Sequence, residues 1–328
     1  MTLQMMQSIV AAAESQAEDN RAGGTLGWIG AGRMGAAMIE RLLEAGHPVK
    51  VYNRTRSKLE PLVAAGASAV DTISGLSGLE VVFTSVGGPD DLTAVTMGEG
   101  GLLTLERPPR VIVDVSTVSA EASATVRAKC GEQGVAFLAA PASGNPGAVR
   151  SGHVTFAASG PRDVYESVAP VLGAIGAGAT YCGEGELARL VKLCHNLFLG
   201  TVAQSLIEVT LLAEKGGIDR GSFLRFLNAS VMGSTFTGYK ATALVNLDFR
   251  PTFTARLLRK DLELGLAAAR ELEVPMPVSA LVGQIVAALV GEGHGDQDFA
   301  ALIAMQARGA GVDLEKTMNT GEKTKSGE

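Results

Sequence analysis

The chain has 328 residues, which is long for one compact unit and makes two domains the reasonable expectation. Its net charge of -6 argues against a general nucleic-acid binder, because neutralising phosphates requires an excess of lysine and arginine. Aromatic residues make up only 5% of the chain, so the core must be built mainly from Ala, Val, Leu and Ile. The 41 glycines favour tight turns between strands and helices.

Cysteine use and the N-terminal segment predict a reduced, cytoplasmic protein. Cys130, Cys182 and Cys194 are an odd number without paired spacing, so we expect three free, buried thiols. Residues 1–24 hold a short apolar run but no basic leader, so we expect an extra N-terminal tail and not a signal peptide. Longer apolar stretches are interrupted by charges or turn formers, and we therefore predict no membrane span.

Short apolar runs alternate with helical segments from residue 25 onward. Strands are predicted at residues 26–29, 49–52, 81–85, 111–115, 137–140 and 154–158. Helices are predicted over residues 34–44 and from the second strand to Ala65, where Gly66 marks a stop. Strands separated by helices of this length predict parallel βαβ units, and hence a doubly wound α/β sheet with helices on both faces.

The first predicted strand runs directly into Gly30-Ala31-Gly32-Arg33-Met34-Gly35, a G-x-G-x-x-G pattern. In this setting Gly30 permits a tight turn, Gly32 lets the backbone approach a pyrophosphate, and Gly35 lets the helix pack closely on the strand. The helix that opens at Arg33 and Met34 would direct its N-terminus at the anion. The pattern alone is weak, and an ordinary glycine turn is the alternative, but its place between strand and helix favours dinucleotide binding.

The residue that ends the second strand bears on the choice between NAD and NADP. An acidic residue there would accept hydrogen bonds from the ribose hydroxyls and favour NAD, but this chain has Asn53. Arg54 can make charge-assisted hydrogen bonds to a 2′-phosphate, and Asn53 and Thr55 would add neutral polar contacts. A solvated basic turn is the alternative. The sequence therefore favours NADP(H).

Two later segments are candidates for ligand contact. Residues 114–117 (DVST) close the strand at 111–115, where a loop of a doubly wound sheet can meet the nicotinamide. Residues 141–148 (PASGNPGA) offer backbone N–H groups and the Ser143 hydroxyl, a combination that binds carboxylates. A plain surface loop explains the second composition equally well.

A helical pattern of about thirty residues follows, from Glu186 to Lys215, and we expect it to join the two domains. Lys192 and Asn196 stand one turn apart on it, so they share a face and can reach one ligand together. Apolar neighbours of Lys192 would favour its neutral amine, which suits proton transfer, although a lysine that extends to solvent is the alternative. His195 points about a hundred degrees away from Asn196, and we interpret it as a packing residue that can also form a hydrogen bond.

The remaining pattern is helical throughout. Helices are predicted over residues 219–229, 253–273, 277–290 and 299–307. The chain therefore divides into a dinucleotide-binding Rossmann domain at 25–185 and an all-helical domain at 186–310. Residues 311–328 are polar, and we expect this C-terminal tail to be disordered.

Taken together, these motifs resemble the β-hydroxyacid dehydrogenase family, a group that includes 3-hydroxyisobutyrate dehydrogenase. The matching pieces, in chain order, are GWIGAGRMGAAM, YNRT, DVST, PASGNPGAVRSGHVTF, KLCHN and LLRKDLELGLAAA. Their occurrence together and in order is far more specific than any one of them. The resemblance runs from about Thr25 to about Ala310, which is nearly the whole chain apart from its two tails.

The resemblance implies a role for the residues that match the substrate site of the family. Ser143 and Gly144, with Asn145 beside them, would bind the substrate carboxylate. Lys192 would act as the proton donor or acceptor, and Asn196 would orient the substrate.

On the cofactor side, the resemblance implies that Ser116 lies near the nicotinamide and that Lys260 contributes to the same part of the site. Asn145 replaces the third glycine of the family's Ser-Gly-Gly stretch. Asparagine tolerates the left-handed conformation better than most residues, but its side chain would intrude on the pocket. Glu186 and Ala188 stand where members often carry glycine, which would let the long helix begin earlier.

The activity implied by the resemblance is NADP(H)-dependent interconversion of a small 3-hydroxy acid and its semialdehyde, with Lys192 as general acid and base. Alternatives are NADPH-dependent imine reduction, 6-phosphogluconate dehydrogenase, whose helical domain is longer, and a non-catalytic NADPH-binding interaction module. The expected partners are a small anionic substrate and other copies of the chain, in a homodimer or homotetramer. No H-x-x-H or C-x-x-C spacing occurs, so we predict no metal.

Overall fold

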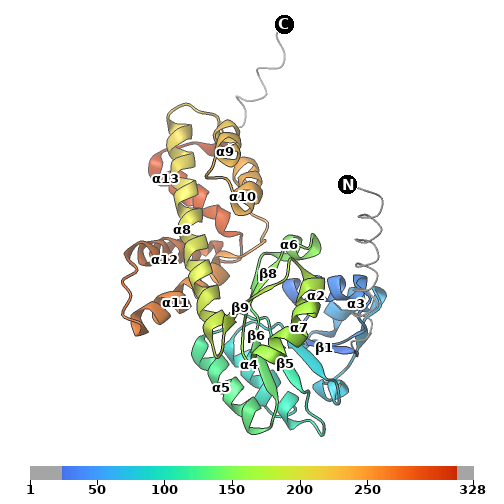
Figure 1. Ribbon diagram of the computed structural model, residues 1–328. Helices are drawn as coiled ribbons and strands as arrows, with labels where there is room; N and C mark the ends of the chain where they lie inside the picture. Colours follow the sequence, from blue (N-terminus) through green and yellow to red (C-terminus); the bar gives the residue numbers. More distant parts are fainter. Residues whose placement is uncertain (1–23, 316–328) are drawn as a thin grey trace, which may run out of the picture. The chain divides into compact units, whose positions relative to one another are not determined.

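The computed structural model describes residues 24–315, and the chain forms two compact units (Figure 1). The first unit ends at Lys192 and the second begins at Leu193. Most of the two predicted tails, at 1–24 and 311–328, lies outside the described residues.

The first unit is built on one mixed sheet. Among the described residues its strand order is β3-β2-β1-β4-β5-β6-β8-β7, and β9 pairs with β8. The strands are β1 (Leu26–Ile29), β2 (Val49–Tyr52), β3 (Ser68–Ala69), β4 (Val81–Thr84), β5 (Val111–Asp114), β6 (Ala136–Ala139), β7 (Ala142–Ser143), β8 (Thr155–Ser159) and β9 (Ala179–Gly183). The strands predicted from the sequence are confirmed, with bounds that differ by about one residue.

The expected parallel pairing is confirmed for β1 to β6 but is wrong at β8. Neighbours from β3 through β6 pair in parallel, whereas β8 runs antiparallel to both β6 and β7. The chain between Ser143 and Thr155 holds only a short helix, and a parallel connection needs a crossover of a dozen residues or more. The short connection therefore reverses the strand direction at this edge.

Helices cover both faces of the sheet, as a doubly wound fold requires. They are α2 (Arg33–Glu44), α3 (Glu60–Ala64), α4 (Pro89–Met97), α5 (Ala120–Glu132), α6 (Pro146–Arg150) and α7 (Arg162–Ile175). Successive strand residues enter different cores, because side chains alternate between the faces of a strand. Trp28 and Phe83 stack at 5.0 Å in the core beneath α2 and α7, while their neighbours Ile29 and Val82 lie in the core beneath α4 and α5.

The second unit is helical throughout its described part. Its helices are α8 (Leu187–Lys215), which begins in the first unit, α9 (Arg220–Ala229), α10 (Thr235–Asn246), α11 (Ala255–Glu271), α12 (Pro277–Leu289) and α13 (Leu302–Ala310). The long helix predicted from Glu186 to Lys215 is thus confirmed to within one residue. Helix α10 is not predicted from the sequence, because threonines and Gly238 lower its helix propensity, but a capping box between Ser234 and Thr237 opens it.

By length and composition α8 could cross a membrane, although the sequence pattern predicts no such span. The core helix of a globular protein passes the same test, and more than half of the relevant window is buried inside the structure. Apolar residues of α8 enter the core of the second unit, among them Leu206, Ile207 and Leu211.

The three cysteines are free, but they are not all buried as expected. Cys130 is buried in α5, and burial raises the pKa of its thiol to about 12. Cys182 is half-buried and Cys194 is exposed on α8.

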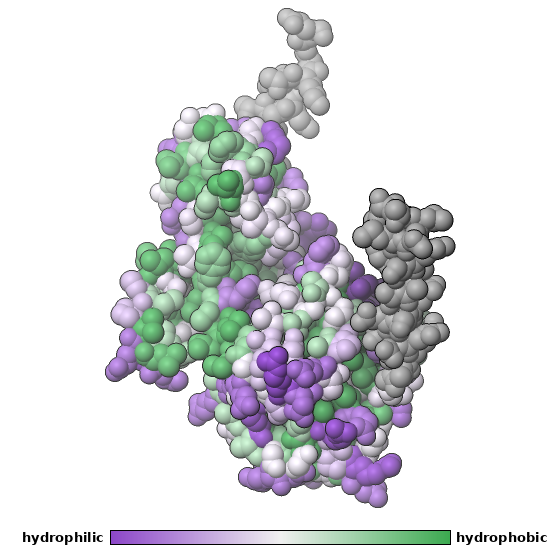
Figure 2. Space-filling view, viewed as in Figure 1, coloured by the Kyte–Doolittle hydropathy of each residue, from purple (hydrophilic) through white to green (hydrophobic). Residues whose placement is uncertain are grey.

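Exposed apolar side chains concentrate in the second unit, where Figure 2 shows broad hydrophobic areas. Among the residues that the structure describes, the large apolar side chains that are at least 60% exposed are Phe198, Leu212, Phe226, Val231, Met232 and Leu281. All of these lie beyond the boundary at Leu193. Monomeric proteins rarely expose apolar patches of this kind without a partner.

Candidate functional site

The glycine-rich turn between β1 and α2 has the geometry predicted for it. Gly30 has a φ of +99°, and a Cβ there would lie 2.1 Å from the Ser85 carbonyl oxygen. A Cβ on Gly35 would lie 2.1 Å from the carbonyl oxygen of Gly30. Neither position can therefore carry a side chain without moving the backbone.

Gly32 differs from the other two glycines because it faces open space. A Cβ at Gly32 would meet nothing within 4 Å, and the residue is the N-cap of α2. Arg33 and Met34 form the first turn of α2, and no acidic residue lies in that turn. An N-terminus without a nearby carboxylate suits an approaching anion.

The end of β2 is tied to the glycine-rich turn by Asn53. Its Oδ1 accepts a hydrogen bond from the Ala31 N–H at 2.9 Å, and its Nδ2 donates to the Thr55 carbonyl at 2.8 Å. The Asn53 amide thus holds two loops together, a role that the sequence did not reveal.

Arg54 and Thr55 follow on the surface. The Arg54 side chain is 86% exposed and forms an ion pair with Asp91 at 3.4 Å. Thr55 is exposed and occupies the N-cap position of the short 3-10 helix at Arg56–Leu59 without a hydrogen bond from its side chain to the helix. An exposed pair of this kind contributes little stability, so Arg54 can exchange Asp91 for a ligand at little cost.

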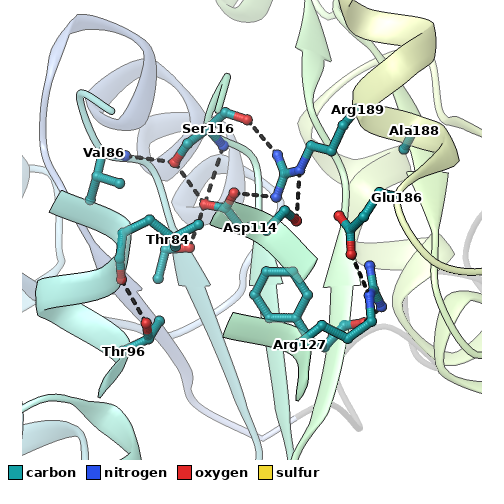
Figure 3. A network of polar contacts seen from close by, with 12 residues as sticks. Thr84, Val86, Thr96, Asp114, Ser116, Arg127, Glu186, Ala188 and Arg189 are labelled. Atoms are coloured by element: carbon teal, nitrogen blue, oxygen red, sulfur yellow. Dashed lines mark hydrogen bonds and ion pairs between the residues drawn. The ribbon is translucent and has the colours of Figure 1, made fainter. Parts of the chain in front are cut away.

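Ser116 belongs to a buried polar network at the ends of β4 and β5 (Figure 3). Its hydroxyl donates to Asp114 Oδ1 at 2.7 Å and accepts from the Val86 N–H at 2.9 Å. The Thr84 hydroxyl donates to the same carboxylate oxygen at 2.6 Å. The Ser116 hydroxyl is therefore engaged within the protein, and a contact with a cofactor would have to come from its backbone or its surroundings.

Arg189, in the first turn of α8, completes this network. Its side chain is 1% exposed and its Nη2 donates to Asp114 Oδ2 at 2.5 Å. Arg189 Nη1 donates to the Ser116 carbonyl at 2.6 Å, and Nε donates to the Ser123 hydroxyl at 3.0 Å. Figure 3 shows the guanidinium group directed from α8 at the loop that follows β5.

The segment predicted to hold the substrate carboxylate forms β7 and the start of α6. Ser143 pairs with Thr155 of β8, and Gly144 has a φ of +148°. Asn145 has a φ of -121°, so the left-handed conformation considered from the sequence is not needed there. It is Gly144 that requires glycine.

Asn145 does not project freely from this loop. Its Oδ1 accepts from the Ala148 N–H at 2.9 Å, and its carbonyl accepts from the Val149 N–H at 3.0 Å. The residue is thus the N-cap of α6. The Ala148 N–H is thus engaged within the segment and is not offered to a ligand.

Lys192 and Asn196 both lie on α8, one turn apart as predicted. Lys192 is half-buried, with Leu193 buried beside it but Val191 44% exposed, so the expected apolar setting is only partly present. Asn196 is buried, and its Nδ2 donates to Asp261 Oδ2 at 2.6 Å.

Asp261 links the second unit's candidate residues into a cluster. Lys260 forms an ion pair with Asp261 Oδ1 at 3.2 Å. The His195 ring Nδ1 lies 2.9 Å from Asn196 Oδ1, so this histidine forms a hydrogen bond, as the sequence interpretation allows. Lys260, Asp261, Asn196 and His195 therefore meet, which the sequence pattern did not predict for Asp261 or His195.

A signal for the missed residues is present in the sequence. Asp114 ends an otherwise apolar strand, and a carboxylate in that place requires a buried donor or cation. Arg189 stands among Leu187, Ala188 and Leu190 and is the cation that pairs with the Asp114 carboxylate. The separation of the two residues along the chain hides their pairing from local patterns.

Within residues 24–315, no three His, Cys, Asp or Glu side chains gather as ligands for a metal ion.

Family models match almost all of the described chain. The NAD binding domain of 6-phosphogluconate dehydrogenase matches residues 25–183. The NAD-binding domain of NADP-dependent 3-hydroxyisobutyrate dehydrogenase matches residues 186–306.

Curated relatives match over most of the chain. An uncharacterized oxidoreductase, YfjR of Bacillus subtilis, is 32% identical over 84% of this chain and 97% of its own length. The 2-(hydroxymethyl)glutarate dehydrogenase of Eubacterium barkeri is 30% identical over 88% and 97%. The chloroplastic glyoxylate/succinic semialdehyde reductase 2 of Arabidopsis thaliana is 28% identical over 84% and 78%.

Solved structures share the fold. Psf3, in complex with NADP+ and 2-OPP, has a TM-score of 0.79 at 26% identity, over 86% of this chain and 99% of that one. An imine reductase from Pseudomonas sp. has a TM-score of 0.59 at 19% identity, over 86% and 99%, a likeness of fold alone.

Proposed function

Because the chain belongs to the β-hydroxyacid dehydrogenase family and carries its NAD(P)-binding domains, we propose that it interconverts a small 3-hydroxy acid and its semialdehyde. The observation that carries the proposal is the turn from Gly30 to Gly35, in which Gly30 and Gly35 leave no room for a Cβ and Gly32 opens α2 with free space in front of it. This turn fits the pyrophosphate of a dinucleotide.

The cofactor proposed is NADP(H) in preference to NAD(H). Asn53 stands where an NAD-binding chain would place a carboxylate, and its amide is engaged with Ala31 and Thr55. The exposed guanidinium of Arg54 is the group that would bind the 2′-phosphate, with Thr55 beside it. Arg33 and Met34 would present their N–H groups to the pyrophosphate, and Ser116 and Lys260 would border the nicotinamide, as in the family.

When bound, NADPH supplies the hydride that reduces the aldehyde carbon. Ser143 and Gly144 would bind the substrate carboxylate, with Asn145 fixing their loop through its cap on α6. Lys192 would give a proton to the alkoxide oxygen in reduction and take it back in oxidation. Asn196, held by Asp261, would orient the substrate.

We propose a homo-oligomer as the working form and the cytoplasm as its location. The exposed apolar side chains of the second unit support an association between copies of the chain, because water contact with such side chains is unfavourable.

The test is NADPH and NADH oxidation with a panel of anionic aldehydes, namely methylmalonate, tartronate and succinate semialdehydes and sulfolactaldehyde. 2-Methylpropanal is the matched control for methylmalonate semialdehyde, because it carries a methyl group in place of the carboxylate. We expect NADPH-dependent turnover of at least one anionic aldehyde and about ten- to a hundredfold weaker turnover of 2-methylpropanal than of methylmalonate semialdehyde, since a charge-assisted hydrogen bond is lost.

Two other results would redirect the proposal. Turnover of a cyclic imine without turnover of any aldehyde would make the chain an imine reductase. Tight NADPH binding without turnover of either class would indicate a non-catalytic NADPH-binding module.

A further inference from the structure

We propose that the buried Arg189 is a positioning residue, which fixes the position of Lys192 relative to the loop that carries Ser116. The inference rests on the proposed function, in which Lys192 transfers a proton and the Ser116 loop borders the nicotinamide. No contact of Arg189 with substrate or cofactor is involved, because its side chain is 1% exposed.

The guanidinium group joins three elements of the first unit. From α8 it reaches the Asp114 carboxylate at the end of β5, the Ser116 carbonyl in the following loop, and the Ser123 hydroxyl in α5. The planar fork of arginine presents several N–H groups in fixed directions, which suits one side chain with three acceptors. A lysine could pair with the carboxylate but could not reproduce this fork.

The Ser116 loop is held from two sides. Arg189 binds the Ser116 carbonyl, while the Ser116 hydroxyl bridges Asp114 Oδ1 and the Val86 N–H. Thr84 completes the acceptor capacity of Asp114 Oδ1. A movement of Arg189 therefore shifts the position of the Asp114 carboxylate. This carboxylate in turn sets the position of the loops after β4 and β5.

Lys192 follows Arg189 by three residues on α8, a spacing that places neighbouring side chains on one side of a helix. The segment before Arg189 is fixed by further contacts. Arg127 donates to Glu186 Oε1 at 2.6 Å and to the Gly185 carbonyl at 2.7 Å, and the Ala188 N–H donates to the Ser159 hydroxyl at 3.0 Å. Arg189 lies within one helical turn of Lys192, and the other anchors lie within about two turns, so together they set where the Lys192 backbone lies.

Exact placement matters because proton transfer depends on hydrogen-bond distance. A shift of about 1 Å at a catalytic group can cost about a hundredfold in rate. The network thus gives a physical reason for a buried charge at this place, namely that it couples the proton-transfer helix to the cofactor edge of the sheet.

The second unit supplies a matched control. Arg220 is also buried, pairs with Glu214 at 2.8 Å, and donates to the Leu244 carbonyl at 2.9 Å. Arg220→Gln removes a comparable buried pair without touching the Ser116 loop or the start of α8. Arg189→Lys is the second variant, because it keeps the charge beside Asp114 and loses the fork.

The experiment measures kcat, KM and the NADPH dissociation constant for Arg189→Gln, Arg189→Lys and Arg220→Gln, at a temperature where each is folded. We expect both Arg189 variants to lose about ten- to a hundredfold in kcat. NADPH affinity should stay within about twofold, and Arg220→Gln should keep the wild-type kcat. In a Lys192→Ala background, Arg189→Lys should cause little further loss, because residues that act through one another are not additive.

Hydrogen exchange of the full chain gives a readout that does not depend on turnover. Arg189→Lys should speed exchange at residues 187–192 and around Ser116, whereas Arg220→Gln should not. Unchanged exchange in these segments, unchanged kcat in Arg189→Lys, or full additivity with Lys192→Ala would overturn the inference. A wild type that reduces no aldehyde would defeat the proposed function alone, and the exchange result would then decide the inference about Arg189.

Discussion

Two buried arginine–carboxylate pairs, one in each unit, have the same chemistry but different surroundings. Arg189 pairs with Asp114 and Arg220 pairs with Glu214, and the side chains in both pairs are at most 4% exposed. In each pair the guanidinium also donates to backbone carbonyl oxygens. Burial of a charge therefore does not distinguish the two regions.

The difference lies in what each arginine connects. Arg220 binds the carbonyl oxygens of Leu244, near the end of α10, and of Leu314, beyond α13, and so ties helix ends together. Arg189 binds the loop after β5 and the helix that carries Lys192. A buried ion pair by itself therefore does not indicate a functional region. It does so only when the helices or loops that it connects contain candidate site residues.

The largest expected effect comes from breaking either pair on its carboxylate side. Asp114→Ala and Glu214→Ala should each lower the free energy of unfolding by about 3–5 kcal/mol, because each leaves a buried guanidinium unpaired. Urea unfolding followed by circular dichroism would measure the loss. Unchanged turnover in Asp114→Ala, or abolished turnover in folded Glu214→Ala, would contradict the claim that only the Arg189 pair serves the candidate site.

Filling the glycine-rich turn should have the next largest effect. Gly35→Ala places a Cβ against the Gly30 carbonyl, so we expect a cost of about 1–3 kcal/mol in stability. We also expect loss of NADPH binding, measured by fluorescence titration. Gly173→Ala is the control, because a Cβ in that helix meets nothing within 4 Å and should be neutral or stabilising. Wild-type NADPH affinity in Gly35→Ala would contradict the assignment.

Removing the exposed side chain of Arg54 should change only the preference for NADPH over NADH. Arg54→Ala should raise the KM for NADPH by about ten- to a hundredfold, the cost of a charge-assisted hydrogen bond, and leave that for NADH unchanged. Arg56→Ala is the neighbouring control, since Arg56 pairs with Asp71 on the surface. Equal effects on both cofactors, or a larger effect at Arg56, would place the 2′-phosphate elsewhere.

The last prediction concerns the pH dependence of a third buried pair, between Lys240 and Asp298 in the second unit. Burial alone would raise the pKa of Asp298, but the Lys240 ammonium and hydrogen bonds from Lys240, Ala300 and Thr252 hold that pKa below its usual range. The carboxylate therefore stabilises the fold above about pH 4 and loses this contribution as the pH falls through the lowered pKa.

Asp298→Asn should accordingly lower stability at neutral pH and less so in acid. Urea unfolding of both proteins at neutral pH and below about pH 4 would measure the difference. A gap between wild type and variant that grows on acidification would contradict the direction of the pKa shift.

Local patterns in the sequence predicted the strands of the sheet well. They predicted poorly the buried contacts between side chains that are far apart in the chain. Strands β1, β2, β4, β5, β6 and β8 were found because apolar runs between glycine-rich turns are local signals. The direction of β8 was wrong because strand direction depends on the length of a connection, and residues 144–154 gave no clear strand or helix pattern.

The candidate site shows the same limit. Gly30 and Gly35 have the settings expected from their motif, because the motif lies within a few residues of chain. Arg189 and Asp261 were missed because their roles depend on partners far away in sequence. A hydrogen bond of His195 was allowed from the sequence, but its partner, the Asn196 amide, depends on side-chain conformations that the helical pattern does not give.

The most direct test of the central claim compares wild type with Lys192→Ala in NADPH oxidation on an anionic aldehyde. The account predicts turnover by the wild type and a loss of about a hundredfold or more in kcat, with NADPH affinity retained, as loss of a general acid requires. An unchanged kcat in Lys192→Ala would contradict the claim that this lysine transfers the proton.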